Sequence, residues 1–228
     1  MTRTAVVAGV GPGLGESLVR KFHAEGCQVA MLARTESYLD SLAGELERAL
    51  AVPTDLAAPG EIEAAFETVR EAFGAVDVLV NHASAATWEG VAECDREAFD
   101  RALDVGVRAA FVCSQEAVAD MRDGDGGTVI FTGATTSVRG REGAVGFSAA
   151  KFGARGLAES MARELGPEGV HVAHVVLDGG IRPPEGTVEE PAAYLDPDEI
   201  AESYWHLVEQ DRSAWTLELD LRPHVEEF

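Results

Sequence analysis

Residues 4–15 read Thr-Ala-Val-Val-Ala-Gly-Val-Gly-Pro-Gly-Leu-Gly, and this stretch decides the fold class. Its first part, residues 4–9, is an apolar run of the kind found in strands that are buried on both faces of a parallel sheet. A helical pattern over residues 14–24 follows the glycines directly. This order is typical of a phosphate-binding turn, because the free N–H groups and the positive dipole at a helix start hold an anion.

The alternation of strand and helix continues along the chain. Further strands are predicted over residues 27–33, 50–54, 76–81, 128–133, 170–177 and 215–220. Helices are predicted over residues 36–48, 61–73, 96–121, 147–165 and 197–209. This repetition predicts one α/β domain over residues 1–228, a doubly wound parallel sheet of the Rossmann type with helices on both faces. Residues 182–197 are rich in Pro, Gly and Glu, and we expect them to form a lid over a small-molecule substrate.

The charge balance argues against several classes of partner. Eighteen basic and 40 acidic side chains give a formal net charge of −22. A surface this negative repels nucleic acid and anionic lipid, so neither is expected as a partner. The three cysteines form no C-x-x-C pattern, which is typical of a reducing compartment. No apolar run approaches the about 18 residues that a membrane span needs. Together these features predict a cytoplasmic protein. The acidity and the scarcity of lysine fit a salt-rich host or, equally, a GC-rich genome.

No metal site is predicted. His171 and His174 are three residues apart in a strand, so their side chains point to opposite faces of the sheet and cannot form a metal-binding pair.

The end of the second predicted strand indicates which dinucleotide the turn binds. An acidic residue at this place would bond both hydroxyls of the adenosine ribose and favour NAD. This chain has Arg34 and Thr35 there instead. Because a guanidinium can grip a 2′-phosphate with two hydrogen bonds, this pair favours NADP over NAD. The alternative for Arg34 is a surface pair with Glu36 or Asp40.

Taken together, the motifs resemble the short-chain dehydrogenase/reductase family over essentially the whole chain. They are residues 9–15, Thr54-Asp55-Leu56, Asn81-His82-Ala83-Ser84, Lys151 and Asp178-Gly179-Gly180-Ile181. The resemblance implies a homodimer or homotetramer. The resemblance, together with the glycine-rich turn and with Arg34 and Thr35, predicts the residues that bind the cofactor. They are Gly9, Gly11, Pro12, Gly13, Leu14, Gly15, Arg34, Thr35, Asp55, Leu56, Asn81, His82, Ala83, Lys151, Gly179 and Ile181.

The catalytic positions depart from the pattern of that family, which usually has Asn, Ser, Tyr and Lys. Lys151 is present, but Phe147 stands in place of Tyr, Ala134 in place of Ser and Gly106 in place of Asn. A phenyl ring has no proton to give, and losing a positioned general acid typically costs about 10²–10⁴-fold in rate. Lys151 is still expected to bond the ribose hydroxyls next to the nicotinamide.

Thr135 is the residue predicted to act in catalysis beside Lys151. It follows Ala134, and its hydroxyl can enter the same cleft, although threonine is a poor proton source unless water relays the proton. Thr136, Ser137 and Tyr194 are weaker candidates for the missing acid.

The sequence therefore predicts an NADP(H)-dependent oxidoreductase with a non-standard active site. Its apolar replacements suit an activated C=C bond, whose carbanion solvent can protonate after hydride transfer. The dienoyl-CoA reductase branch of the superfamily is similar in lacking Tyr before Lys. Two alternatives stay open: a catalytically inactive NADP(H)-binding sensor or partner subunit, and a ketone reductase that uses Thr135 and water.

Overall fold

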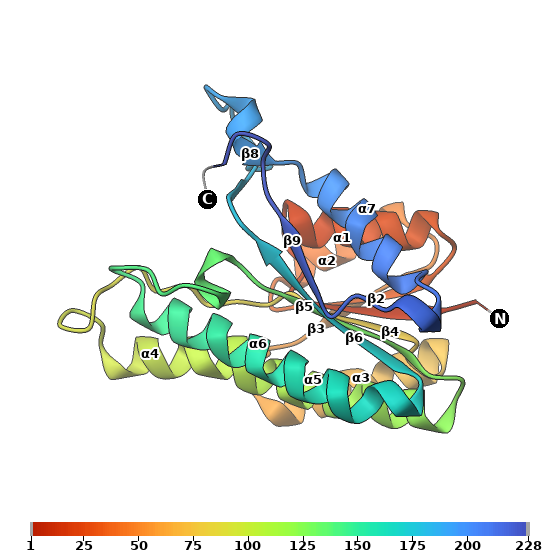
Figure 1. Cartoon of the computed structure of the whole chain (residues 1–228). Coiled ribbons are helices and arrows are strands. Elements are labelled where there is room, and N and C mark those ends of the chain that lie inside the picture. Colours follow the sequence, from red (N-terminus) through yellow and green to blue (C-terminus); the bar gives the residue numbers. More distant parts are fainter. Residues whose placement is uncertain (1, 227–228) are drawn as a thin grey trace.

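Seven parallel strands, within the part of the chain that the structure describes, form one central sheet (Figure 1). The structure, a computed structural model, describes residues 2–226. The strand order is β3-β2-β1-β4-β5-β6-β9, and every neighbouring pair is parallel. The strands are β1 (Thr4–Ala8), β2 (Gln28–Ala33), β3 (Ala49–Pro53), β4 (Val78–Asn81), β5 (Gly127–Thr132), β6 (Val170–Leu177) and β9 (Glu218–Leu221). The predicted α/β fold with one parallel sheet is confirmed.

Helices cover both faces of this sheet (Figure 1). One face carries α1 (Leu14–Ala24), α2 (Glu36–Glu45) and α7 (Pro197–Val208). The other carries α3 (Pro59–Phe73), α4 (Arg96–Leu103), α5 (Ala109–Asp123) and α6 (Val145–Leu165). Each face therefore has its own apolar core, with Phe22 and Tyr204 in the first and Phe66 and Phe131 in the second. None of the helices within residues 2–226 has the length and apolar character needed to cross a bilayer.

Local chemistry explains where several elements start. All five residues of β1 are buried because helices cover both of its faces, which accounts for its unbroken apolar run. The side chain of Asp95 accepts a hydrogen bond from the N–H of Ala98 at 2.7 Å and so caps α4. Asp196 caps α7 in the same way, and Pro197 occupies the first helical position, where no N–H is needed.

The predicted helix over residues 96–121 is wrong in one respect. It consists of α4 and α5 joined by a π-helical turn, Asp104–Arg108, which contains Gly106. A π turn carries one extra residue, so the 3.6-residue periodicity that predicts a helix does not reveal it. Here α6 packs so closely that a Cβ added at Gly106 would lie 2.8 Å from the Cβ of Ala150.

Several element boundaries also differ from the predictions, most of them by one or two residues. Helix α2 ends at Glu45 rather than at residue 48, because Leu46 is extended and buried. Strand β9 starts at Glu218 rather than at residue 215, because Trp215 stacks on His171. Residues 182–197 are not wholly irregular. They include a 3₁₀ turn, Pro191–Ala193, and strand β8 (Tyr194–Leu195), which pairs with β7 (Gly180–Ile181). The remaining short turns are Thr135–Ser137, Gly166–Glu168 and Arg212–Ala214.

Leu79 in the middle of β4 provides a test of the packed core. Its side chain is fully buried, so Leu79→Ala should lower the free energy of unfolding by about 2–5 kcal/mol through lost contacts and the cavity left behind. Urea unfolding of the two proteins measures this loss. Leu217→Ala is the matched control, because Leu217 is 38% exposed and its truncation should cost under about 1 kcal/mol. Equal losses in the two variants would contradict the assignment of β4 to the centre of the sheet.

Candidate active site

The main cleft lies at the carboxyl ends of the central strands. The chain runs from β1 outward to β2 and β3 and then returns to the other side of β1 as β4, so the strand order reverses between β1 and β4. Open α/β sheets bind their ligands at such a point. The cleft has a volume of about 1140 Å³ and is lined by residues that follow β1, β2, β3, β4, β5 and β6.

The glycine-rich turn after β1 forms one wall of this cleft. Gly9 has a φ of +107°, and a Cβ there would lie 2.5 Å from the backbone nitrogen of Ala83, which follows β4. Ala83 and His82 both donate their N–H groups to the carbonyl of Ala8, at 2.7 and 3.0 Å. Among the described residues no side chain caps the start of α1. The turn therefore presents uncapped N–H groups to the cleft, as an anion site requires.

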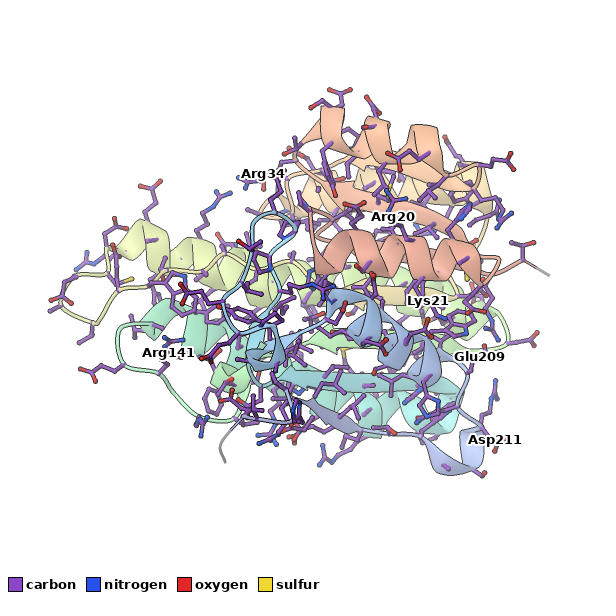
Figure 2. All side chains as sticks on the ribbon, turned by 90° about the horizontal axis from the view of Figure 1, so that it is seen from above. Arg20, Lys21, Arg34, Arg141, Glu209 and Asp211 are labelled. Atoms are coloured by element: carbon purple, nitrogen blue, oxygen red, sulfur yellow. The ribbon has the colours of Figure 1, made fainter. Side chains whose placement is uncertain are left out.

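Arg34 and Thr35 lie at another end of the cleft, after β2. Both are exposed, and the Arg34 guanidinium forms no ion pair or hydrogen bond with any residue in 2–226, so the surface pairs with Glu36 and Asp40 are not formed. Figure 2 shows Arg34 well separated from Arg141, which comes from the segment before α6. A guanidinium without a carboxylate partner is available to bind a phosphate.

The structure brings most of the predicted cofactor residues to this one cleft. Those that line it are Gly9, Gly11, Pro12, Gly15, Arg34, Thr35, Asp55, Leu56, His82, Ala83, Lys151, Gly179 and Ile181. Three do not. Gly13 precedes α1, Leu14 is buried at its first position, and Asn81 is buried with its amide donating to Ser114 Oγ at 3.1 Å.

Lys151 lies at the bottom of the cleft on α6. It is buried, and its ammonium donates to the backbone carbonyl of Thr132 at 2.8 Å. Burial lowers the pKa of Lys151 to about 8, so the ammonium form still predominates at neutral pH. An ammonium has three N–H donors, and the hydrogen bond to Thr132 uses one of them. The others are available to a ligand in the cleft.

Thr132 joins Lys151 to two further polar side chains. The buried hydroxyl of Tyr204 on α7 donates to Thr132 Oγ1 at 2.9 Å, and His82 Nδ1 lies 3.2 Å from the same oxygen. Burial, with a smaller contribution from the charge of Lys151, lowers the pKa of His82 to about 4, so His82 is neutral at pH 7. The sequence analysis missed Tyr204, because α7 reaches this site only through the fold.

Phe147 and its neighbours form a largely apolar part of the cleft wall above Lys151. The Phe147 ring lines the cleft, with its centroid 5.6 Å from Lys151 Nζ and 5.2 Å from the ring centroid of Trp88. Ala134 has no hydroxyl, and its N–H bonds Ser137 Oγ at 3.0 Å, which gives that hydroxyl a structural role. Next to Gly106 a cavity of about 10 Å³, with room for about one water, is bordered by Asn81 and Lys151.

Thr135 lines the cleft, but its hydroxyl is already engaged. Thr135 Oγ1 donates to Asp178 Oδ1 at 2.6 Å, and Asp178 also lies 3.4 Å from Arg222 Nη2. The hydrogen of Thr135 is therefore directed at a carboxylate rather than at a ligand. Thr136 also borders the cleft, whereas neither Tyr194 nor any other residue of 182–197 does.

The two histidines of β6 are held separately. His171 Nδ1 contacts the carbonyl of Leu207, and His174 Nδ1 contacts Glu218 Oε2. Among residues 2–226 no group of three or more His, Cys, Asp or Glu side chains is placed to hold a metal ion.

The buried ammonium of Lys151 predicts a measurable pH dependence of stability. Its pKa in the folded protein, about 8, is lower than the ordinary lysine value of 10.5, so between these pH values the unfolded chain holds a proton that the folded chain has lost. The stability of the wild type relative to Lys151→Met should therefore rise by up to about 3 kcal/mol as the pH increases from 7 to 10.5. Urea unfolding of both proteins across this range measures the difference.

The only other lysine in the sequence supplies the control. Hydrogen bonds that its ammonium donates to Glu202 and Glu25 raise the pKa of Lys21, so its contribution to stability is fully present below pH 10.5 and is lost only above it. The stability gap for Lys21→Met should accordingly stay constant between pH 7 and 10, where the gap for Lys151→Met changes. A gap for Lys151→Met that does not change with pH would show that its ammonium is not buried.

Known proteins with similar sequences and folds identify the family. Residues 3–184 match the family model for short chain dehydrogenases. A 3alpha-hydroxysteroid dehydrogenase of Mediterraneibacter gnavus is 28% identical over 95% of this chain and 94% of its own. The crystal structure of a short-chain dehydrogenase from Rhodopseudomonas palustris is 32% identical, with a TM-score of 0.87 over 97% of this chain and 99% of its own. A metagenomic short-chain oxidoreductase in complex with NADP is 25% identical, with a TM-score of 0.86 over 98% of both chains. The protein belongs to the short-chain dehydrogenase family of oxidoreductases.

Proposed function

We propose that the protein is an NADP(H)-dependent oxidoreductase with a non-standard active site, and that it reduces a conjugated C=C bond rather than a simple ketone. The observation that carries the proposal is the combination of a buried, cationic Lys151 with a phenyl ring, Phe147, at the usual position of the acid. Lys151 serves cofactor binding and is kept. The hydroxyl that would protonate an alkoxide is absent, because Phe147 occupies its position.

The choice of NADP is supported by Arg34. Its guanidinium borders the cleft without a carboxylate partner in the described chain, and no acidic side chain stands at the end of β2 to bond a free ribose. A bidentate phosphate contact suits this group. The NADP in the complex of the metagenomic relative belongs to that protein, so for this chain the assignment depends on Arg34.

The residues of the cleft fit such a dinucleotide. The uncapped start of α1 suits the pyrophosphate, and the spare donors of Lys151 suit the hydroxyls of a ribose. When bound, the reduced cofactor supplies a hydride. Around the acceptor, Phe147 and Ala134 provide apolar surface, and we place Thr135 beside the substrate, where its hydroxyl, which donates to Asp178, can accept a hydrogen bond but not supply a proton.

An activated C=C bond needs less from the protein than a ketone does. Hydride addition to an isolated carbonyl places the negative charge on one oxygen, which requires a nearby donor. Addition to a conjugated C=C bond spreads the charge over several atoms, and the open cleft admits water to protonate the carbanion. Phe147 is then compatible with turnover.

The second candidate is a non-catalytic NADP(H)-binding sensor or partner subunit. The replacement of three of the four usual catalytic groups favours it, as does the close packing at Gly106, which leaves no space for the usual Asn beside Ala150. Both candidates expect cofactor binding. Only the oxidoreductase expects a substrate-dependent loss of the absorbance of the reduced nicotinamide, so a screen of enones and enoyl thioesters separates the two.

We further propose a cytoplasmic homodimer or homotetramer. This assembly is supported by the exposed Phe111 on α5 and Phe152 on α6, which lies next to the small residue Gly153. Residues 182–197 are proposed to close over the substrate once it is bound. Their attachment through β8 places them beside Gly180 and Ile181.

Arg34→Gln tests the choice of cofactor. Loss of a charge-assisted phosphate contact should weaken NADPH binding about 10- to 100-fold, while NADH, which has no 2′-phosphate, should bind as before. Isothermal titration of both cofactors against both proteins measures this. An equal effect on the two cofactors would refute the NADP assignment, and no binding of either cofactor to the wild type would refute the proposed function.

Phe147→Tyr tests the acceptor class. A hydroxyl beside Lys151 restores a general acid, so the rate of ketone reduction should rise at least about tenfold, whereas enone reduction should change little. Steady-state oxidation of NADPH with a matched ketone and enone measures both rates. If the wild type reduces the ketone as fast as the variant does, another residue supplies the proton and the proposed acceptor class is wrong.

A further inference from the structure

Three arginines border the cleft on the side away from Arg34, which is notable in a chain with a net charge of −22. Arg101 comes from α4, and Arg139 and Arg141 come from the segment between β5 and α6. We call these three residues the arginine cluster. No ion pair of Arg101 or Arg141 occurs among residues 2–226. Arg139 is exposed, and its nearest carboxylate oxygen, on Asp178, is 3.8 Å away.

The carboxylates around the cleft do not cancel this charge. Asp178 lies at the carboxyl end of β6, where it is shared by Thr135, Arg222 and, at 3.8 Å, Arg139. Glu226 lines the cleft near Gly179, on the same side as Asp178. Glu142 also lines the cleft and directly follows Arg141 in the sequence. Beside the three guanidinium groups of the arginine cluster, the cleft is lined by the carboxylates of Glu142 and Asp178, so the guanidinium groups outnumber them and the local charge is positive.

An aromatic surface connects the arginine cluster to the reacting position. The guanidinium carbon of Arg141 lies 5.1 Å from the ring centroid of Trp88, and Trp88 in turn packs against Phe147. Trp88 is 59% exposed and lines the cleft. An exposed indole in a cleft wall is typical of a site that binds flat apolar groups.

From this arrangement we infer that the substrate is an anion, with a planar conjugated body and a carboxylate at the end remote from the reacting bond. The inference extends the proposed function and rests on it. The body lies along Trp88 and Phe147, and the carboxylate is bound by Arg139 and Arg141, because guanidinium groups match a carboxylate with paired hydrogen bonds. The net charge of the chain repels anions at a distance, so binding one requires a local positive group of this kind.

The test compares two ligands that differ in one charge. They are benzylideneacetone with a para carboxylate and the methyl ester of the same compound. Affinity is measured by isothermal titration with oxidised NADP present, so that no turnover is needed, and kcat/KM is measured separately with NADPH. The carboxylate should bind at least about tenfold more tightly than the ester, and only its affinity should fall as the salt concentration rises.

Four variants locate the effect. Arg139→Gln and Arg141→Gln should each weaken binding of the carboxylate about tenfold and leave the ester within about twofold. Glu142→Gln should strengthen binding of the carboxylate, because it removes a like charge. Arg163→Gln makes the same change of charge on α6 at a residue that does not line the cleft and should leave both ligands unchanged.

The outcomes separate this inference from the proposed function. Equal binding of acid and ester, an equal effect of the arginine variants on both, or no binding of either ligand would overturn the inference. Titration with NADPH alone reports on the cofactor site, and thermal unfolding shows whether each variant is folded. If NADPH binds and the neutral enone turns over while the arginine variants have no effect, the function stands and the anionic substrate does not.

Discussion

The close contact between the end of β4 and the turn after β1 is the constraint on which the cleft depends. The backbone of Ala83 lies against Gly9 so tightly that no side chain fits between them, and both N–H groups of His82 and Ala83 bond the carbonyl of Ala8. This contact holds the two central strands together at the point where the strand order reverses. It also places the residues that follow β4 next to the uncapped start of α1. Without it, the anion-binding turn and the catalytic positions would not share one cleft.

Below the cleft, a small set of buried polar groups is arranged around Thr132. Lys151, His82 and Tyr204 come from three different parts of the chain, and each forms one hydrogen bond with Thr132. Burying the Lys151 ammonium costs stability, as its lowered pKa shows. A group that weakens the fold yet points at a cleft is typical of a binding site, because the free energy is recovered only when a partner is bound.

The charge of the molecule is distributed unevenly in a way that bears on its ligands. Most basic side chains are paired with acidic ones, as Arg70 is with Asp120 and Arg122 with Glu168. Arg34, Arg101 and Arg141 form no ion pair with the described residues, and all three border the cleft, whereas Arg139 lies 3.8 Å from Asp178. A strongly acidic protein thus has guanidinium groups without a carboxylate partner where a dinucleotide phosphate and, by our inference, a substrate carboxylate would lie.

The sequence by itself determined the fold class and the family resemblance, and it predicts that Phe147 stands in place of a catalytic Tyr. These follow from local patterns: apolar runs for strands buried on both faces, glycines for the turn, and single positions such as Phe147 whose chemistry is fixed by residue type. The extra residue of the π turn at Gly106 left no trace in the helical periodicity. Only the tertiary structure decided which side chains meet. No local sequence pattern predicts a contact between residues that are far apart in the chain, and the site depends on such contacts: Tyr204 with Thr132, Thr135 with Asp178 and Arg141 with Trp88. Burial decided the rest, since the loss of water that lowers the pKa of Lys151 and His82 depends on packing from several elements at once.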